Sequence, residues 1–413
     1  MILRARIVLP VSQPPVENGA VAISENKIRA VGPWADLKSD SDENVFDLGE
    51  VVLLPGLVNA HCHLDYTDMA GQLSPPKTFT DWIPLIMGAK SAWTYSDYAR
   101  SWVNGAKMLL RTGTTTVGDI EAMPDLLPEV WEAAPLRVVS FLEMTGIRLQ
   151  PGAREILRAT VEKMDSLSHG ICRASLSPHA PYSTSLELLK LTSEFARKRN
   201  LRVATHIAES PDEFEMFASA RGKMFDWLAR SQRDNSDCGL GSPVQHAGRA
   251  GLLGENLLAI HVNVLARGDA ALLRKTRTHV VHCPRSHEYF KHPPFQRERL
   301  ASAGVNIALG TDSLATTRKA GKQKPELNMF AEMRALAVAG KKISPAEILK
   351  MATVNGARAL GMAGQAGELS KNAFADLIVI PFAGKSSEVH EAVLHHEGNV
   401  AASMIEGRWA FQG

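Results

Sequence analysis

Short β-like runs and helical patterns alternate through the middle of this 413-residue chain, and this alternation limits its possible folds more than any other feature. Helical patterns occur, for example, at 185–200 and 269–277. Strands that alternate with helices favour βα units and a parallel sheet. The β-like runs lie at 56–63, 114–121, 137–144, 172–180, 202–209, 257–264, 279–287 and 305–313. Because eight such units close a barrel, we predict an α/β fold with a (β/α)8 TIM-like barrel over residues 55–364.

The two ends of the chain show a different residue pattern. Residues 1–54 carry short β-like runs separated by polar turns, without a long helical period. The same pattern returns at 374–381 and 400–413. Such runs are typical of antiparallel strands. We therefore expect residues 1–54 and 365–413 to join in one small β-sandwich, separate from the barrel.

Two stretches between predicted strands, 64–113 and 211–256, are longer than plain connections. Long connections inside a compact domain are commonly functional, and the loops of a barrel form its working face. We expect these two stretches to be insertions that cover an active site.

Composition and charge favour a small-molecule ligand. The chain has 46 basic and 44 acidic residues, interspersed, and a net charge of +2. No basic surface for nucleic acid or an anionic membrane is indicated, and no run of about 18 uncharged apolar residues suggests a membrane span. Sparse cysteines without a CxxC pair are typical of reduced thiols and a cytoplasmic protein. They are Cys62, Cys172, Cys238 and Cys283.

Polar residues gather at the predicted carboxyl ends of the strands, where a barrel places its chemistry. Buried imidazoles and carboxylates need partners, so a hydrophobic core alone would not select them. This distribution predicts a functional site at that end of the barrel. The residues are His61, His63, Asp119, Glu121, Glu143, His179, His206, Glu209, His261, His282 and Asp312.

The stretch "PGLVNAHCH" places two histidines on one side of a strand, because side chains of a strand alternate between its faces. A single buried histidine is usually a core residue, but His61 and His63 are joined by His206 and Asp312 from other predicted strand ends. Three imidazoles and one carboxylate suit Zn²⁺ or Fe²⁺. One ion is the simplest interpretation, since the fourth strand ends in "SPHAPY", without a lysine to bridge a second.

Several motifs in a fixed order resemble the amidohydrolase superfamily over nearly the whole chain. They are the HxH after "PGLVNA", then "SPHAPYSTS", "HIAES", "IHVNV" and "LGTDS". The chain looks most like the mononuclear, metal-dependent deaminase branch. That branch includes methylthioadenosine and S-adenosylhomocysteine deaminases, aminodeoxyfutalosine deaminases, cytosine and guanine deaminases, and the triazine chlorohydrolases.

The resemblance implies a role for each motif. By this resemblance, the metal ligands are His61, His63, His206 and Asp312. Glu209 carries over as the proton shuttle and His261 as the residue beside the attacking water. Elementary chemistry agrees with these roles. Asp312 can accept the proton of the water, Glu209 can protonate a ring nitrogen and then the leaving amine, and His261 can stabilise the developing charge.

Other residues are candidate substrate contacts. His179 of "SPHAPY" matches a histidine that contacts the ligand in similar nucleoside deaminases, and Trp82 of "FTDWI" could stack on a flat heterocycle. Glu143 could contact substrate or hold loops. Arg285 and His287, after the seventh predicted strand, are also expected to contact substrate.

The chain departs from the methylthioadenosine deaminases at two places. Those enzymes have a glutamate for ribose hydroxyls in the first insertion, where "PPKTFTDWI" offers Asp81 at most. They have asparagine where this chain has His287, and here His292 follows. A different ligand shape is implied, and the histidine-rich segment resembles aminodeoxyfutalosine deaminases.

We therefore predict a hydrolytic deaminase of an aminated N-heterocycle or nucleoside-like molecule, with aminodeoxyfutalosine or adenosine-type substrates favoured. It would hold one divalent ion per chain, Zn²⁺ ahead of Fe²⁺. Similar enzymes are homo-oligomers, dimers or larger. The alternatives are an amidohydrolase or chlorohydrolase acting on another C–N or C–halogen bond, and a non-catalytic scaffold.

Overall fold

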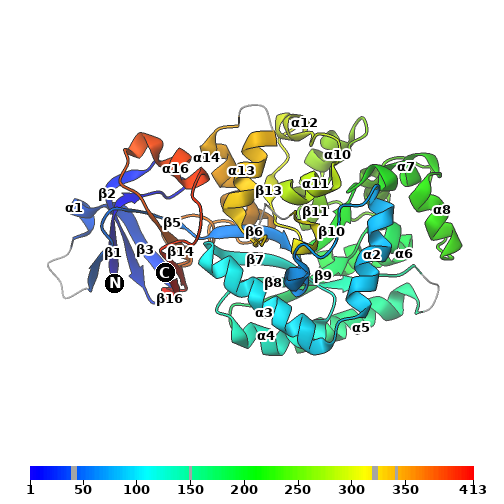
Figure 1. Ribbon diagram of the computed structural model, residues 1–413, viewed down its shortest axis with the longest axis horizontal. Coiled ribbons are helices and arrows are strands. Elements are labelled where there is room, and N and C mark those ends of the chain that lie inside the picture. Colours follow the sequence, from blue (N-terminus) through cyan, green and yellow to red (C-terminus); the bar gives the residue numbers. More distant parts are fainter. Residues whose placement is uncertain (39–43, 148–150, 319–323, 340–342) are drawn as a thin grey trace.

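Parallel strands form a closed barrel in the computed structural model, which describes residues 1–38, 44–147, 151–318, 324–339 and 343–413 (Figure 1). The first and last strands meet, because Cys62 and Asp312 form a parallel bridge and the Thr311 amide donates to the His61 carbonyl at 3.0 Å. Neighbouring strands pair in chain order: β6 (Leu57–Cys62), β7 (Thr114–Glu121), β8 (Arg137–Met144), β9 (Arg173–Pro178), β10 (Val203–Ile207), β11 (Leu257–His261), β12 (His279–His282) and β13 (Ile307–Leu309).

Apolar side chains from several strands fill part of the barrel interior. Val58, Ile120 and Phe141 are buried there in one cluster with Leu360 from the end of α15 (Val354–Ala359). Side chains of this kind fill a barrel as a packed core. Buried histidines lie near the carboxyl ends of β6, β10, β11 and β12.

Helices cover the outside of the barrel. The helix α3 (Tyr95–Arg111) shows why such segments are helical. The Thr94 and Asp97 side chains form a capping box at its start. Trp102 and Leu109 are buried on its inner face, and Arg111 lies in its last turn. The other outer helices are α4 (Leu127–Ala133), α5 (Ala153–Ser166), α6 (Leu186–Lys198), α9 (Pro243–Arg249), α10 (Asp269–Lys275), α12 (Arg297–Ser302), α13 (Met329–Ala339) and α14 (Pro345–Met351).

The loops at the working face carry helices of their own. The stretch 64–113 contributes η1 (Leu64–Met69) and α2 (Phe79–Ser91), and the stretch 211–256 contributes α7 (Pro211–Ser219) and α8 (Lys223–Arg230). The helix α11 (Pro284–Phe290) follows β12 directly. Shorter 3-10 turns are η2 (Pro124–Leu126), η3 (Pro181–Ser183), η4 (Leu314–Thr316) and η5 (Ser386–Glu388).

The two chain ends form a second, mixed sheet beside the barrel (Figure 1). Residues Leu377–Pro381 of the carboxyl-terminal part pair antiparallel with Val51–Pro55 of the amino-terminal part. The strand order is β16 (Arg408–Gln412), β15 (Ala402–Ile405), β14 (Leu377–Pro381), β5 (Val51–Pro55), β1 (Ile2–Val8), β2 (Val16–Ser24) and β3 (Lys27–Pro33), with β4 (Val45–Asp47) beside β1. Two short helices, α1 (Trp34–Leu37) and α16 (Val389–Leu394), accompany this sheet.

The predicted fold class is confirmed by these two sheets. The predicted division into 1–54 plus 365–413 for the terminal domain and 55–364 for the barrel stays a prediction.

All four cysteines are buried free thiols. Among the described residues, none of the helices combines the length and the apolar character that a membrane crossing requires.

A buried ion pair joins the barrel to the terminal sheet. The Arg137 guanidinium, at the start of β8, donates to both oxygens of Asp376, at 2.8 and 3.3 Å, and to Glu406 at 3.3 Å. The Phe374 ring lies under the same guanidinium, 3.7 Å from its centre. The Glu406 amide also donates to Asp376 at 2.8 Å. Every charged group of this joint has a partner.

Candidate metal centre and active site

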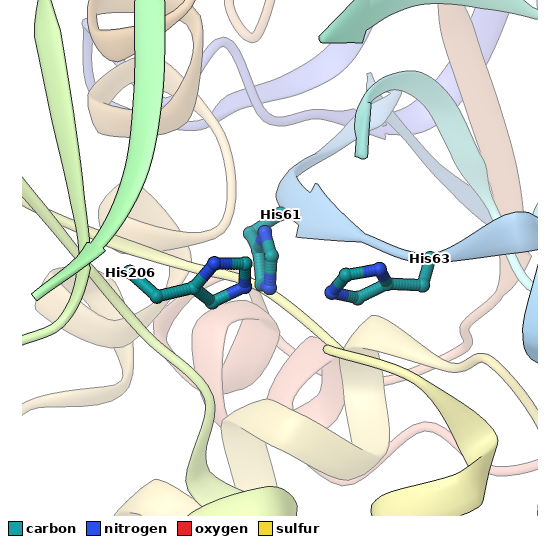
Figure 2. A group of neighbouring side chains, drawn as sticks. All are labelled: His61, His63 and His206. Atoms are coloured by element: carbon teal, nitrogen blue, oxygen red, sulfur yellow. The ribbon is translucent and has the colours of Figure 1, made fainter. Parts of the chain in front are cut away.

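Three histidine rings converge at the carboxyl end of the barrel (Figure 2). His61 lies in β6, His63 directly follows it, and His206 lies in β10. One ring nitrogen from each lies within 4.8 Å of the others, close to the span of a coordination shell with Zn–N bonds of about 2.0–2.1 Å. The two strands therefore aim their imidazoles at one point.

A backbone hydrogen bond orients His206. Its Nδ1 lies 2.8 Å from the carbonyl oxygen of His179, which can only accept, so Nδ1 carries the hydrogen. The Nε2 lone pair is therefore left for the centre, in the arrangement common to metal-bound histidines. Burial lowers the pKa of His206 to about 3, with the nearby His179 and His61 adding to the effect. The imidazole is neutral at physiological pH, as a metal ligand must be.

Asp312, just beyond β13, completes the group. Its Oδ1 lies 3.6 Å from Nε2 of His61 and 3.7 Å from Nε2 of His63. The carboxylate also accepts a hydrogen bond from the Ser286 hydroxyl at 2.6 Å and from the Ser313 amide at 2.8 Å. Burial alone would raise the pKa of Asp312, but the surrounding histidines hold it well below its ordinary value. The Asp312 side chain is therefore ionised, and these hydrogen bonds hold it in position.

Several buried ring nitrogens at this centre lack a hydrogen-bond partner. Both ring nitrogens of His61, Nδ1 of His63 and Nε2 of His261 are buried and have no hydrogen-bond partner within the described residues. Core histidines are normally satisfied, because an unpaired buried polar group costs about 1–3 kcal/mol. Three neutral imidazoles and a carboxylate are the donor set of a Zn²⁺ site. The residues present therefore fit one divalent ion.

Glu209 and His261 lie beside this donor set. The two side chains are buried, and Oε1 of Glu209 lies 3.5 Å from Nε2 of His261. Burial, with the nearby charges of Asp312 and Glu213, raises the pKa of Glu209 well above its ordinary value. A carboxyl group whose pKa is raised in this way is suited to hold a proton and deliver it.

The Glu209 peptide is held from two sides. Its amide donates to Oε2 of Glu213 at 2.8 Å, and its carbonyl accepts from Nδ2 of Asn263 at 2.9 Å. The other amide atom of Asn263, Oδ1, lies 3.0 Å from Nδ1 of His287. Ala208 just before Glu209 has a φ of +53°, a strained value that persists only where surroundings enforce it. The three side chains fix the backbone that carries the carboxyl group.

A cavity of about 920 Å³ opens onto the centre. The insertions supply part of its wall, as predicted. Residues of α2 line the cavity, and so do Trp227 of α8 and Ser231 at the end of α8. Both helices lie on the side of the barrel away from the terminal sheet (Figure 1). Its volume and largely apolar lining are those of a small-molecule site. The apolar lining residues are Phe79, Trp82, Ile83, Ile86, Met87, Ile147, Ile156 and Trp227.

The predicted substrate contacts divide into two groups. His179, Trp82 and Glu143 line the cavity, but Arg285 and His287 do not. The Arg285 guanidinium donates to Oε1 of Glu332 at 2.5 Å and so braces α11 against α13. The role of Arg285 and His287 as substrate contacts stays a prediction: both lie in α11, and neither is among the residues that line the cavity.

Sequence reasoning missed some supporting residues. Ser286, Glu213 and Asn263 hold the residues of the centre, and the Tyr66 ring stacks on His63 with 5.3 Å between ring centres. Ser286 lies in the segment "HCPRSH" and Asn263 in "IHVNV", so both stand inside motifs that drew attention for other residues. Their contacts depend on how separate strands meet.

Two other predicted strand-end residues have structural partners. Asp119 accepts hydrogen bonds from the Leu64 amide and the Trp102 indole, both at 3.0 Å. The His282 ring stacks on Phe295 with 3.8 Å between ring centres, and His282 does not line the cavity. Neither residue faces the centre.

Comparison with known proteins agrees with this site. The model of the Amidohydrolase family matches residues 52–410, and the chain belongs to that family. It is 32% identical to a 5-methylthioadenosine/S-adenosylhomocysteine deaminase of Syntrophobacter fumaroxidans, over 91% of this chain and 87% of the relative. It is 28% identical to an aminodeoxyfutalosine deaminase of Deinococcus radiodurans, over 72% of each chain. The resemblance stated from the motifs is confirmed.

Solved structures show the same fold. A Helicobacter pylori aminofutalosine deaminase, in complex with methylthio-coformycin, has a TM-score of 0.88 and 21% identity, with 99% of each chain covered. An adenosine deaminase of Xanthomonas campestris with bound zinc has a TM-score of 0.84 and 24% identity, over 99% of this chain and 92% of the other. At these identities the likeness concerns the fold.

Proposed function

We propose that this protein is a metal-dependent hydrolytic deaminase that removes an amino group from an N-heterocycle of the nucleoside type and releases ammonia. The observation that carries the proposal is the position of Glu209. A buried carboxyl group with a raised pKa lies beside His261, at the edge of a metal donor set, and faces a cavity large enough for a nucleoside.

His61, His63, His206 and Asp312 would hold the ion. Zn²⁺ is the first candidate because of the donor set and Fe²⁺ the second. A divalent ion bound there supplies Lewis acidity and a water nucleophile at neutral pH. The neutral imidazole of His206 and the carboxylate of Asp312 are already in the protonation states that such binding requires.

The side chains of the chain itself move the protons. Glu209, protonated through its raised pKa, gives its proton to the ring nitrogen next to the amino-bearing carbon. Asp312 takes a proton from the attacking water, and His261 stabilises the charge that develops on the oxygen. The proton held by Asp312 then passes to the amino group, which leaves as ammonia, and Glu209 takes back a proton from the new hydroxyl group, so the product is a lactam-like carbonyl.

Adenosine-type substrates, aminodeoxyfutalosine included, are favoured by the names of the relatives and by the cavity. Its wall combines aromatic rings from α2 with aliphatic side chains, which suit a flat base. On the same likeness we propose a cytoplasmic homo-oligomer, dimer or larger, whose size light scattering after gel filtration would measure.

Ammonia release from the purified, metal-analysed protein tests the proposal. The panel is adenosine, methylthioadenosine, S-adenosylhomocysteine, aminodeoxyfutalosine, guanine, cytosine and an aminotriazine. Release from a nucleoside, abolished by a chelator and by Glu209→Gln but retained in the exposed control Glu129→Gln, is the expected result. Silence across the panel would contradict it: with one bound ion, amide or C–halogen hydrolysis becomes the better interpretation, and without an ion, the scaffold.

A further inference from the structure

Three carboxylates line the cavity, and only two of them have a task so far. Asp312 belongs to the metal donor set and Glu209 to proton transfer, whereas Glu143 has neither role. Glu143 is the penultimate residue of β8. Within the described residues its carboxylate forms no hydrogen bond, and Nε2 of His179 lies 4.0 Å from its Oε2. A partly buried carboxylate without a donor is expected to receive one from a ligand.

Its position indicates which part of the ligand it meets. The His179 ring lies between Glu143 and the metal centre, with 4.8 Å between the ring centres of His179 and His206. The Nδ1 atom of His179 is engaged with the Ser183 hydroxyl at 2.6 Å, so the ring is held in place. A heterocycle that reacts at the metal centre lies against His179, and Glu143 meets the group attached to the heterocycle.

Other polar groups that could bind this appendage are already occupied. The Asp81 carboxylate accepts a hydrogen bond from the Thr78 hydroxyl at 2.9 Å and pairs with Lys223, and Asp81 does not line the cavity. Lys90, the single lysine or arginine among the cavity-lining residues described, donates to the Tyr66 hydroxyl and lies over its ring. Of these three charged side chains, Glu143 is therefore the one left to accept hydrogen bonds from a ligand.

We infer that Glu143 accepts hydrogen bonds from the vicinal hydroxyl groups of a ribose-like appendage, which makes N-ribosides, rather than free bases, the substrate class. The inference rests on the proposed deaminase function. An ionised carboxylate only accepts, and its two oxygens match two neighbouring hydroxyl donors. Hydrogen bonds to a charged acceptor are stronger than neutral ones. A site built to bind hydroxyl groups discriminates strongly against an analogue that lacks them.

The experiment compares adenosine with 2′,3′-dideoxyadenosine in the wild-type holoenzyme, Glu143→Gln, and the control Asp81→Asn. We expect wild-type kcat/KM to be about 10- to 100-fold higher for adenosine, which is the range for hydrogen bonds to a charged group. Glu143→Gln loses this preference because its rate falls with adenosine and stays unchanged with the dideoxy compound. Asp81→Asn keeps the preference, and metal content is equal in all three proteins.

Two results would overturn the inference: an equal loss with both compounds in Glu143→Gln, which a merely structural role produces, or no preference in the wild type. Failure of the proposed function looks different, because neither compound then yields ammonia. In that case calorimetry of the holoenzyme with inosine and 2′,3′-dideoxyinosine decides the inference without turnover. Tighter binding of inosine that Glu143→Gln abolishes supports it, and equal affinities refute it.

Discussion

Two buried clusters of polar side chains in this molecule differ in one respect. At the joint between barrel and terminal sheet, Arg137 is paired with Asp376 and Glu406, and each charge has a partner. At the carboxyl end of the barrel, His61 and His261 keep buried nitrogens that no described residue satisfies. Both clusters lie out of water, but only the first is complete.

The difference separates structural residues from functional ones. A buried polar group without a partner weakens the folded state, and a chain retains it where a ligand completes the interaction. Near the centre, Ala208, His261, Val262 and Asp312 all have positive φ values, a backbone strain that the surroundings must hold in place. The joint stabilises the fold, and the histidine cluster is arranged for an ion and a substrate.

The sharpest test exchanges one carboxylate in each cluster. Asp312→Ala removes a ligand, so we expect loss of the bound ion and of measurable turnover. Asp376→Ala removes a partner of Arg137, and we expect it to keep the ion and lose stability. Metal analysis and ammonia release from the two variants measure this. If Asp312→Ala kept its ion and its rate, the donor set would be wrong.

Glu209→Gln should lower kcat by about 10²- to 10⁴-fold, the usual contribution of a general acid or base. Metal content should be unchanged, because Glu209 lies beside the donor set rather than in it. Single-turnover kinetics and metal analysis of the same preparation check both points. Wild-type turnover in this variant would remove Glu209 from the reaction.

Arg137→Met should destabilise the fold by about 3–5 kcal/mol, because it leaves buried Asp376 without its counter-charge. The exposed Arg158, 3.5 Å from Glu162, provides the control, and Arg158→Met should cost less than about 1 kcal/mol. Urea unfolding gives both free energies. Equal effects would show that the joint contributes no more than a surface pair, and a lost bound ion in folded Arg137→Met would break the separation between the clusters.

Asn263→Ala should lower kcat by about 10-fold, the effect of losing one hydrogen bond that holds the Glu209 peptide. In a Glu209→Gln background the same change should have no further effect, because the carboxyl group being positioned is already gone. Asn256→Ala, which removes a side-chain bond to the Leu201 carbonyl, is the matched control. Additive losses in the double variant would mean that Asn263 acts independently of the Glu209 carboxyl group.

Much of this arrangement could be predicted from the sequence because two simple periodicities govern it. The period of a strand puts His61 and His63 on one face, and the alternation of strands and helices gathers strand ends at one rim. Arg285 and His287 lie in α11, beyond the last residue of the strand, where no strand period predicts the direction of a side chain. Glu213 and Asn263 could not be predicted because their hydrogen bonds depend on contacts between α7, β10 and the end of β11.

The cavity wall was predicted only in outline. The stretch 64–113 was predicted as an insertion and Trp82 as a substrate contact, but nothing in the sequence indicated that Ile86 of α2 would also line the cavity. Likewise, Glu143 was one of several polar residues at predicted strand ends, and the sequence did not single it out. Its lack of a protein donor becomes visible only when the neighbouring side chains are in place.

The measurement that tests the central claim most directly is a metal titration of the chelated protein with ammonia release as the readout. If the unsatisfied histidines form a mononuclear site, activity on a nucleoside substrate returns in proportion to added Zn²⁺ and saturates at one ion per chain. Full activity without any ion, or a requirement for two ions per chain, would contradict the account.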